Sequence, residues 1–319
     1  MQITVLGDGT FGTALAQTLA SNGHHILLWC YSPEVAHSIE QTGYNAVYMP
    51  EVKLHPTIIP TTSLEEALTT PNSLVIEAIP VAYLRSVLTQ CKPFVDPTTA
   101  WVVTSKGIEA PKVLLPTEIL KDVLGNELST VVLSGPSFAQ ELIIKQPTAL
   151  TLASTYHELA EAVKVLLQND ALLIETSLDE VGVQWCGALK NVIAVALGIV
   201  EGAGYGTNSQ ALVCTKMIHE LKQIIMLYGG DPQTVLSFAG IGDIMLTSYS
   251  SQSRNRETGR ALGKKEIAPH QLPYTEGINS LQAIPSITNL IEIPVFEAVY
   301  EIVYNQADVE SLFTACKKI

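Results

Sequence analysis

The chain has 319 residues, of which 47% are hydrophobic and 15% charged, a composition typical of a folded globular protein and unlike that of a disordered chain. Its formal net charge of −13 at pH 7 argues against nucleic acid or an anionic membrane surface as a partner. The five cysteines form no C-x-x-C pair, which predicts reduced thiols in a cytoplasmic protein. The most apolar run, Val192–Val200, is too short to span a bilayer, so we expect no membrane insertion.

Short apolar runs alternate with helical patterns through the first half of the chain. The candidate strands are, in order, ITVLG, HILLWC, LVIEAIP, AWVVTSKG, TVVLSGP, TALTLAS and ALLIETS. The candidate helices are TALAQTLASNG, a segment from Ser32 with Glu34 in its first turn, PVAYLRSVLTQC and ELAEAVKVLLQ. This spacing predicts βαβ units and a parallel sheet covered on both faces. We therefore expect an α/β Rossmann-type, doubly wound domain over residues 1–178.

The pattern changes near Asp179. The segment DEVGVQWCGALKNVIAVALGIVEGAG predicts one long helix that is broken at GAGYG. Further helices are predicted by SQALVCTKMIHELKQIIMLYG, DPQTVLSFAG and PVFEAVYEIVYNQ, and no convincing strand follows. We therefore expect an all-α C-terminal domain over residues 179–319.

The glycine-rich stretch LGDGTFGTALA lies between the first candidate strand and the first helix. Gly7, Gly9 and Gly12 give the G-x-G-x-x-G spacing of a dinucleotide-binding turn. In such a turn the first glycine permits the tight bend, the second lets the backbone approach the pyrophosphate, and the third lets the helix pack on the strand. The phosphates then lie at the positive end of the helix. The sequence therefore predicts NAD or NADP binding.

The end of the second candidate strand, WCYSPE, leaves the choice between the two dinucleotides open. It has no carboxylate at the position that binds the ribose 2′-OH, because Glu34 lies one helical turn too late. It has no arginine for a 2′-phosphate either. The site is predicted to tolerate NADP without demanding it.

Three cations stand in contexts that suggest a function. Lys106 follows an apolar strand, where ligands bind in doubly wound sheets. Lys190 precedes a long apolar run and should be largely buried, which calls for an anionic partner or a lowered pKa. Arg254 lies in QSRNR, predicted as a loop. The seven histidines show no metal-ligand spacing, so no metal site is expected.

Seven segments together resemble the bacterial type of NAD(P)-dependent glycerol-3-phosphate dehydrogenase, over nearly the whole chain. They are GDGTFGTALA, NAVYMP, TSKGIE, SGPSFAQE, GALKNVIAVALG, AGIGDIMLTSYSSQSRNRETG and TEG, of which GALKN, GIGD and SRNR are the most specific. The resemblance implies interconversion of dihydroxyacetone phosphate and sn-glycerol 3-phosphate by hydride transfer, for phospholipid synthesis. It also implies a cytoplasmic homodimer.

The resemblance further implies roles for individual residues. Lys190 would be the acid and base, Lys106 would polarise the carbonyl and lower the pKa of Lys190, and Asp243 would orient Lys190 or bind a substrate hydroxyl. The implied substrate contacts are Lys106, Gly135, Ser137, Lys190, Asp243, Ser253, Arg254 and Asn255, with Asn191 and Thr247 as supports. The implied cofactor contacts are Gly7, Gly9, Thr10, Phe11, Gly12, Tyr31, Lys106, Ala139, Arg254, Tyr274 and Glu276. Tyr31 stands where the family often has His.

Two other functions remain open at this stage. The first is a reductase of similar plan whose substrate ends in a carboxylate, such as a β-hydroxy acid or ketopantoate. The second is a non-catalytic NAD(P) sensor, which would have no use for both Lys106 and Lys190. Glu77, a carboxylate inside a candidate strand, is expected at a sheet edge or in a structural pair.

Overall fold

The chain folds as two units in the computed structural model, which describes residues 1–69 and 74–318. The first unit comprises residues 1–105 and 116–180, and the second comprises residues 106–115 and 181–319. Residues 106–115 therefore belong to the second unit, although the chain returns to the first unit after them. Each unit has its own hydrophobic core.

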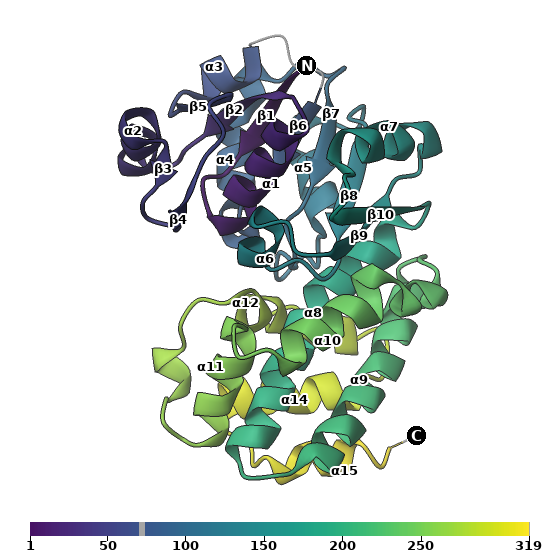
Figure 1. Ribbon diagram of the computed structural model, residues 1–319. Helices are drawn as coiled ribbons and strands as arrows, with labels where there is room; N and C mark the ends of the chain where they lie inside the picture. Colours follow the sequence, from purple (N-terminus) through teal and green to yellow (C-terminus); the bar gives the residue numbers. More distant parts are fainter. Residues whose placement is uncertain (70–73, 319) are drawn as a thin grey trace. The chain divides into compact units, whose positions relative to one another are not determined.

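A twisted sheet forms the centre of the first unit (Figure 1). Among the described residues it has eight strands in the order β10-β9-β8-β7-β6-β1-β2-β5. The strands are β1 (Gln2–Leu6), β2 (His25–Trp29), β5 (Ile58–Thr61), β6 (Leu74–Glu77), β7 (Ala100–Val103), β8 (Thr130–Ser134), β9 (Thr148–Ala153) and β10 (Leu172–Ser177). A separate hairpin pairs β3 (Tyr44–Asn45) with β4 (Met49–Lys53).

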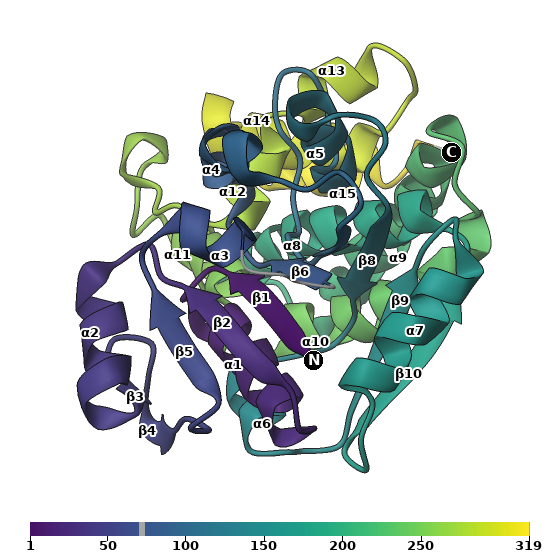
Figure 2. The same cartoon turned by 90° about the horizontal axis from the view of Figure 1, so that it is seen from above.

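Helices cover both faces of this sheet, so its central strands are apolar and buried (Figure 2). One face carries α1 (Thr10–Ser21), α6 (Ala139–Ile143) and α7 (His157–Leu167), and the other carries α3 (Leu64–Thr69), α4 (Val81–Cys91) and α5 (Pro116–Leu124). The helix α2 (Pro33–Thr42) follows β2 and begins within one residue of the predicted start at Ser32, whose hydroxyl accepts a hydrogen bond from the Val35 amide and caps the helix. The parallel-dominated sheet with helices on both faces confirms the Rossmann-type prediction.

Three local features of this unit differ from the predictions. The strand β5, which pairs with β2, and the hairpin β3–β4 were not predicted, because they are short and carry polar or proline residues. The strand β9 runs antiparallel to β8. Its connection from β8 contains only the short helix α6, so the chain turns back at the edge where β8 ends.

Apart from the non-helical segment 106–115, with its isolated bridge between Glu109 and Leu114, the described part of the second unit is built from helices and their connections. Its helices are α8 (Glu180–Gly202), α9 (Thr207–Leu227), α10 (Asp243–Tyr249), α11 (Arg254–Gly263), α12 (Glu276–Leu281), α13 (Ile284–Thr288), α14 (Pro294–Asn305) and α15 (Glu310–Ala315). The segment predicted as a helix at DPQTVLSFAG is instead a 3-10 helix, Pro232–Leu236, followed by a π-helical turn, Phe238–Gly242. The break falls at Ser237, whose hydroxyl accepts a hydrogen bond from the Gly240 amide and begins the new turn.

The helix α8 is the core of the second unit. It is 23 residues long, so its length and composition would let it cross a membrane, contrary to the expectation that its apolar run is too short. Its most apolar window is completely buried inside the protein. Burial, and not shortness, therefore distinguishes α8 from a membrane-spanning helix.

Four glycines let α8 and α11 pack with their backbones in contact. A Cβ at Gly198 or Gly202 would overlap the carbonyl oxygens of Arg256 and Arg260. Conversely, a Cβ at Gly259 or Gly263 of α11 would overlap backbone oxygens of α8. The helix α11 begins at Arg254, and Lys190 lies in α8. The contact between the two helices therefore fixes the position of QSRNR relative to Lys190.

Candidate active site

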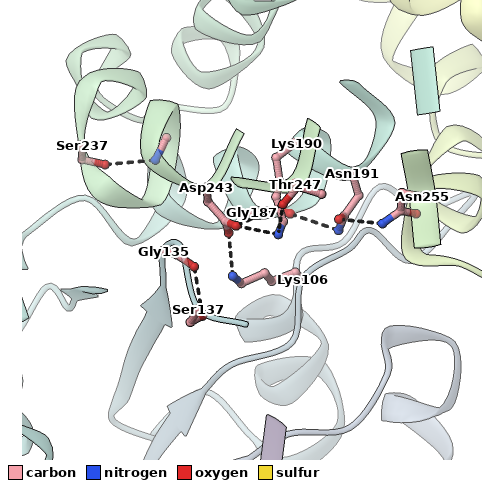
Figure 3. A network of polar contacts seen from close by, with 11 residues as sticks. Lys106, Gly135, Ser137, Gly187, Lys190, Asn191, Ser237, Asp243, Thr247 and Asn255 are labelled. Carbon is pink, nitrogen blue, oxygen red and sulfur yellow. Dashed lines mark hydrogen bonds and ion pairs between the residues drawn. The ribbon is translucent and has the colours of Figure 1, made fainter. Parts of the chain in front are cut away.

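Two lysines share one buried aspartate in the second unit (Figure 3). Lys106 Nζ lies 2.6 Å from Asp243 Oδ2, and Lys190 Nζ lies 2.7 Å from Asp243 Oδ1. Asp243 is 1% exposed and Lys190 is 8% exposed, whereas Lys106 is half-buried. The prediction that Lys190 is largely buried is confirmed. One carboxylate thus holds two ammonium groups beside each other.

Different segments position these three side chains. Lys106 begins the segment 106–115, three residues after β7 ends. Lys190 lies in the middle of α8, and Asp243 is the first residue of α10, directly after the π-helical turn. Thr247, one helical turn beyond Asp243, accepts a hydrogen bond from Lys190 Nζ at 2.8 Å. The Asp243 carboxylate therefore pairs with both lysines and does not cap α10.

Burial changes the acid–base properties of this cluster. It lowers the pKa of Lys190 from 10.5 to about 8, because desolvation of the ammonium outweighs the attraction of Asp243. The like charge of Lys106 lowers the pKa of Lys190 further, in the predicted direction but as a smaller cause than burial. The pKa of Asp243 lies below its ordinary value, since the two ammonium groups outweigh its own desolvation. The cluster can therefore supply or accept a proton near neutral pH.

A chain of hydrogen bonds extends from α8 to α11 and α12. Asn255 Nδ2 donates to Asn191 Oδ1 at 2.9 Å, and the Gly277 amide donates to Asn255 Oδ1 at 2.9 Å. Gly277 has no room for a side chain, because a Cβ there would lie against the carbonyl oxygen of Asn191. Asn191 directly follows Lys190, so this chain ties the lysine-bearing turn of α8 to the start of α11.

Arg254 lies at the first position of α11, and not on a loop as predicted. The helix begins there because the hydroxyl of Ser253 accepts a hydrogen bond from the Arg256 amide and caps the helix. Arg254 is exposed and forms no hydrogen bond or ion pair within the described part of the chain. It combines a free guanidinium with a helix N-terminus, a favourable site for an anion.

The predicted dinucleotide turn lies between β1 and α1 in the first unit. Gly7 has φ +123°, and a Cβ there would lie 2.5 Å from the carbonyl oxygen of Ala78. A Cβ at Gly12 would overlap the carbonyl oxygen of Gly7, whereas one at Gly9 would meet no atom within 4 Å. No side chain caps α1 at Gly9. The backbone N–H groups at Thr10 and Phe11 are thus available to phosphate, and the residues present fit a dinucleotide.

The carboxylate of Asp8, which follows β1, lies beside the residues that follow β2, and the sequence analysis did not identify it. Asp8, inside the glycine motif, accepts a hydrogen bond from the Ser32 amide through Oδ2 at 3.1 Å. Tyr31 is 78% exposed and packs edge-on against Trp29. A search for acidic residues about twenty positions after the motif cannot find Asp8, because the fold and not the spacing brings it to Ser32.

The remaining predicted residues lie in two places. In the first unit, Gly135 has φ +136° after β8, Ser137 Oγ donates to its carbonyl oxygen at 3.0 Å, and Ala139 begins α6. In the second unit, Tyr274 donates its phenol hydrogen to Glu276 Oε1 at 2.9 Å. Among residues 1–69 and 74–318, no three His, Cys, Asp or Glu side chains group as metal ligands.

Comparison with known proteins points to one family. Residues 2–160 match the model of the NAD-dependent glycerol-3-phosphate dehydrogenase N-terminus, and residues 179–314 match that of its C-terminus. A Bacillus cereus protein named NAD(P)+ glycerol-3-phosphate dehydrogenase is 36% identical over 317 residues, 97% of this chain and 93% of that protein. A protein of the same name from Photorhabdus laumondii is 34% identical over 311 residues, 95% of this chain and 91% of that protein. The crystal structure of a glycerol-3-phosphate dehydrogenase from Coxiella burnetii gives a TM-score of 0.91 at 29% identity, covering 99% of both chains.

Proposed function

Because the chain belongs to the NAD-dependent glycerol-3-phosphate dehydrogenase family, we propose that it interconverts dihydroxyacetone phosphate and sn-glycerol 3-phosphate with NAD or NADP. The observation that carries this proposal is the pair of lysines on one buried aspartate. A ketone that accepts a hydride develops negative charge on its oxygen and needs a proton there. Lys190 can donate the proton, and Lys106 can stabilise the negative charge.

The residues divide the work of reduction among them. The dinucleotide, when bound at the glycine turn, supplies the hydride to the carbonyl carbon. Lys190, as an ammonium, donates its proton to the substrate oxygen and becomes a neutral amine. In oxidation the neutral amine takes the hydroxyl proton instead. Lys106 stabilises the developing alkoxide, and Asp243 holds both lysines in place through hydrogen bonds of 2.6 and 2.7 Å.

The N-terminus of α11 would hold the substrate phosphate. Arg254 presents an unpaired guanidinium there, and Asn255 is already fixed by Asn191 and Gly277. A guanidinium and free helix amides together suit a terminal phosphoryl group. In the first unit, Gly135, Ser137 and Ala139 would add contacts to substrate and cofactor. Tyr31, Tyr274 and Glu276 would contribute further cofactor contacts.

The wider context follows the family. Residues 1–178 would serve as the NAD(P)-binding domain and residues 179–319 as the helical substrate and catalytic domain. The protein would act in the cytoplasm as a homodimer and supply glycerol 3-phosphate for phospholipid synthesis. The net charge of −13 supports the absence of nucleic-acid partners.

A direct assay tests this proposal against the two alternatives. Dihydroxyacetone phosphate is added to purified protein with NADH or NADPH, and loss of the nicotinamide absorbance is followed. Rapid oxidation is the expected result, and the ratio of the two rates gives the cofactor preference. Turnover of ketopantoate or a β-keto acid in place of the triose phosphate would establish the first alternative. Cofactor binding without oxidation of any of these would identify a sensor.

A further inference from the structure

Glu77 is a buried carboxyl group that the proposed mechanism does not use. It is the last residue of β6, which pairs with β1 at Leu6 and with β7 at Val103. Glu77 is 0% exposed. It therefore lies inside the sheet, so the expected edge position is wrong and the alternative expectation, a structural pair, remains. The strand order reverses between β1 and β6, so Glu77 lies next to the switch point at which dinucleotides bind.

The contacts of Glu77 connect the ends of β6 and β7. Its Oε1 accepts a hydrogen bond from the Ile79 amide at 2.6 Å and lies 2.5 Å from Ser105 Oγ. Ser105 Oγ also contacts the carbonyl oxygen of Ile79. One carboxyl group and one hydroxyl thus join the turn after β6 to the residue that follows β7 by two positions.

Counting protons in this cluster shows that one is missing if Glu77 is ionised. The Ser105 hydroxyl has one proton, which cannot form straight hydrogen bonds to both Glu77 and the Ile79 carbonyl. A proton on Glu77 resolves the shortage, because Glu77 then donates to Ser105 Oγ and Ser105 donates to the Ile79 oxygen. The second carboxyl oxygen, Oε2, has no hydrogen-bond partner within the described chain, an arrangement that is far less costly for a neutral group than for a charged one.

We propose that Glu77 is a protonated positioning residue whose neutral carboxyl group holds the ends of β6 and β7 in the shape that binds the dinucleotide. The proposal rests on the proposed function, because it assigns the shape to cofactor binding. Glu77 touches the loops and not the reacting atoms. Ionisation of Glu77 would remove its hydrogen-bond donor and leave a buried charge with too few hydrogen bonds. This would loosen the loops that follow β6 and β7.

The electrostatic surroundings agree with a neutral state. Burial raises the pKa of Glu77 from 4.5 to about 7, and this effect outweighs the hydrogen bonds from Ser105 and the backbone, which lower it. β1 and β7 contain no charged residue, although Asp8 and Lys106 follow them. On the helices α3 to α5, Arg85 pairs with Asp122 at 2.6 Å, and α3 carries Glu65 and Glu66. The main causes that set the pKa of Glu77 are its burial and the opposing hydrogen bonds from the Ser105 side chain and the nearby backbone.

Infrared difference spectroscopy tests the protonation directly, without cofactor or substrate. At pH 6 the wild-type spectrum minus that of Glu77→Gln should show the C=O stretch of a protonated carboxylic acid. The matched control is Glu175→Gln on β10, a glutamate that binds a hydroxyl, Thr151 Oγ1, at 2.7 Å in the same sheet. The absence of an acid band that is specific to Glu77 would overturn the proposal.

Fluorescence titration of NADH and NADPH without substrate tests the positioning role. Glu77→Ala leaves the Ile79 amide unpaired, and we expect its Kd to rise roughly tenfold or more. Ser105→Ala should raise the Kd as well. Because Ser105 is only half-buried, this second variant still tests the proposal if Glu77→Ala does not fold. Glu77→Gln keeps an acceptor for the Ile79 amide but cannot also donate to Ser105 from the same atom, so its Kd should rise less than that of Glu77→Ala. Glu175→Gln should not change the Kd.

The pH dependence separates positioning from a purely structural role. Between pH 6 and 8.5 the wild-type affinity for NADH should fall, because Glu77 ionises, whereas the affinity of Glu77→Gln should stay flat. Equal pH profiles for the two proteins would contradict the proposal. These results are distinct from those of the dihydroxyacetone phosphate assay. Turnover with an unaltered Kd in Glu77→Ala would overturn the role of Glu77 alone, and wild-type protein that binds no dinucleotide would overturn the proposed function.

Discussion

Lys190 shows how burial and an ion pair compete at a single residue. Desolvation lowers the pKa of Lys190 and the negative charge of Asp243 raises it, and the net result is a pKa of about 8. An exposed lysine would stay protonated over the whole physiological range and would be a poor base. In the proposed mechanism, a group with this pKa can serve as acid in reduction and as base in oxidation.

This balance predicts opposite pH profiles for the two directions. The rate of dihydroxyacetone phosphate reduction should fall as the pH rises through about 8, because reduction needs the ammonium form. The rate of glycerol 3-phosphate oxidation should rise over the same interval. Steady-state kcat/KM from pH 6 to 10 in both directions checks this. Parallel profiles would show that another group carries the proton.

Removing the Lys190 amine should separate chemistry from cofactor binding. Lys190→Ala is expected to lower kcat by roughly 10²–10⁴-fold, the usual contribution of a positioned acid. The dissociation constant for NADPH should remain close to that of wild type, because the glycine turn lies in the first unit. Single-turnover kinetics and a separate fluorescence titration measure the two effects. Retention of wild-type kcat would reject Lys190 as the acid.

Arg254 should matter for the phosphate and not for the carbonyl. Arg254→Ala is expected to raise the KM for dihydroxyacetone phosphate by roughly 10–100-fold, corresponding to the loss of a charge-assisted hydrogen bond. The slow turnover of unphosphorylated dihydroxyacetone should be unaffected. Arg260→Ala on the same helix is the control, since Arg260 pairs with Glu257. If dihydroxyacetone turnover falls as much as that of the phosphate ester, Arg254 does not bind the phosphate.

At the scale of elements, the contact between α8 and α11 brings the lysine and the proposed phosphate site together. The glycines of the two helices interdigitate, so a backbone of one lies against a backbone of the other. The chain of hydrogen bonds through Asn191 and Asn255 completes the attachment. Two helices far apart in sequence are thereby held at one fixed spacing.

Inserting a methyl group into this contact should disturb the site from a distance. Gly198→Ala forces a Cβ against the Arg256 carbonyl, so we expect about 1–3 kcal/mol of destabilisation and a raised KM for the triose phosphate. Gly206→Ala is the matched control, because a Cβ there meets no atom within 4 Å and the residue has φ −82°. Urea unfolding and substrate kinetics measure both effects. Equal stability of the two variants would show that α8 and α11 tolerate a wider spacing.

At the scale of the whole molecule, a second buried carboxyl group makes the free energy of unfolding depend on pH. Glu220 of α9 accepts hydrogen bonds from the amides of Val295 and Phe296 at 2.8 and 3.0 Å and so caps α14. Burial nevertheless raises the pKa of Glu220 from 4.5 to about 7. A raised pKa in the folded state means that this group stabilises the fold fully below about pH 4.5 and that the contribution is lost as the pH rises through 7.

The Glu220→Gln variant should reveal this contribution. From pH 5 to 8 the wild-type free energy of unfolding should decline by up to about 3 kcal/mol more than that of the variant. This energy corresponds to the difference between the pKa of Glu220 in the folded protein and its ordinary value. Chemical denaturation at several pH values measures the slope. Glu158→Gln on α7 is the control, because Glu158 is exposed and belongs to the first unit, whereas Glu220 belongs to the second, so this variant should leave the slope unchanged. Identical slopes for wild type and Glu220→Gln would show that Glu220 does not take up a proton on folding.

Features that depend on neighbours along the chain could be predicted from the sequence alone. The glycine spacing with its strand and helix, the start of a helix near Ser32 and the apolar pattern around Lys190 are local, and each is present in the structure. The segments from GDGTFGTALA to TEG were enough to indicate the family. Local patterns succeed here because turn geometry, capping and burial of a helix face act over a few residues.

Contacts between residues far apart in the sequence depend on how the whole chain packs. Lys106 and Asp243 are 137 positions apart, and Lys190 and Asp243 are 53 apart, so no spacing rule predicts their contact. The antiparallel direction of β9, the position of Asp8 beside Ser32 and the interior place of Glu77 likewise depend on packing. The reason is physical: the pKa and the partner of a buried charge depend on everything that excludes water around it, and that surrounding is assembled from the whole chain.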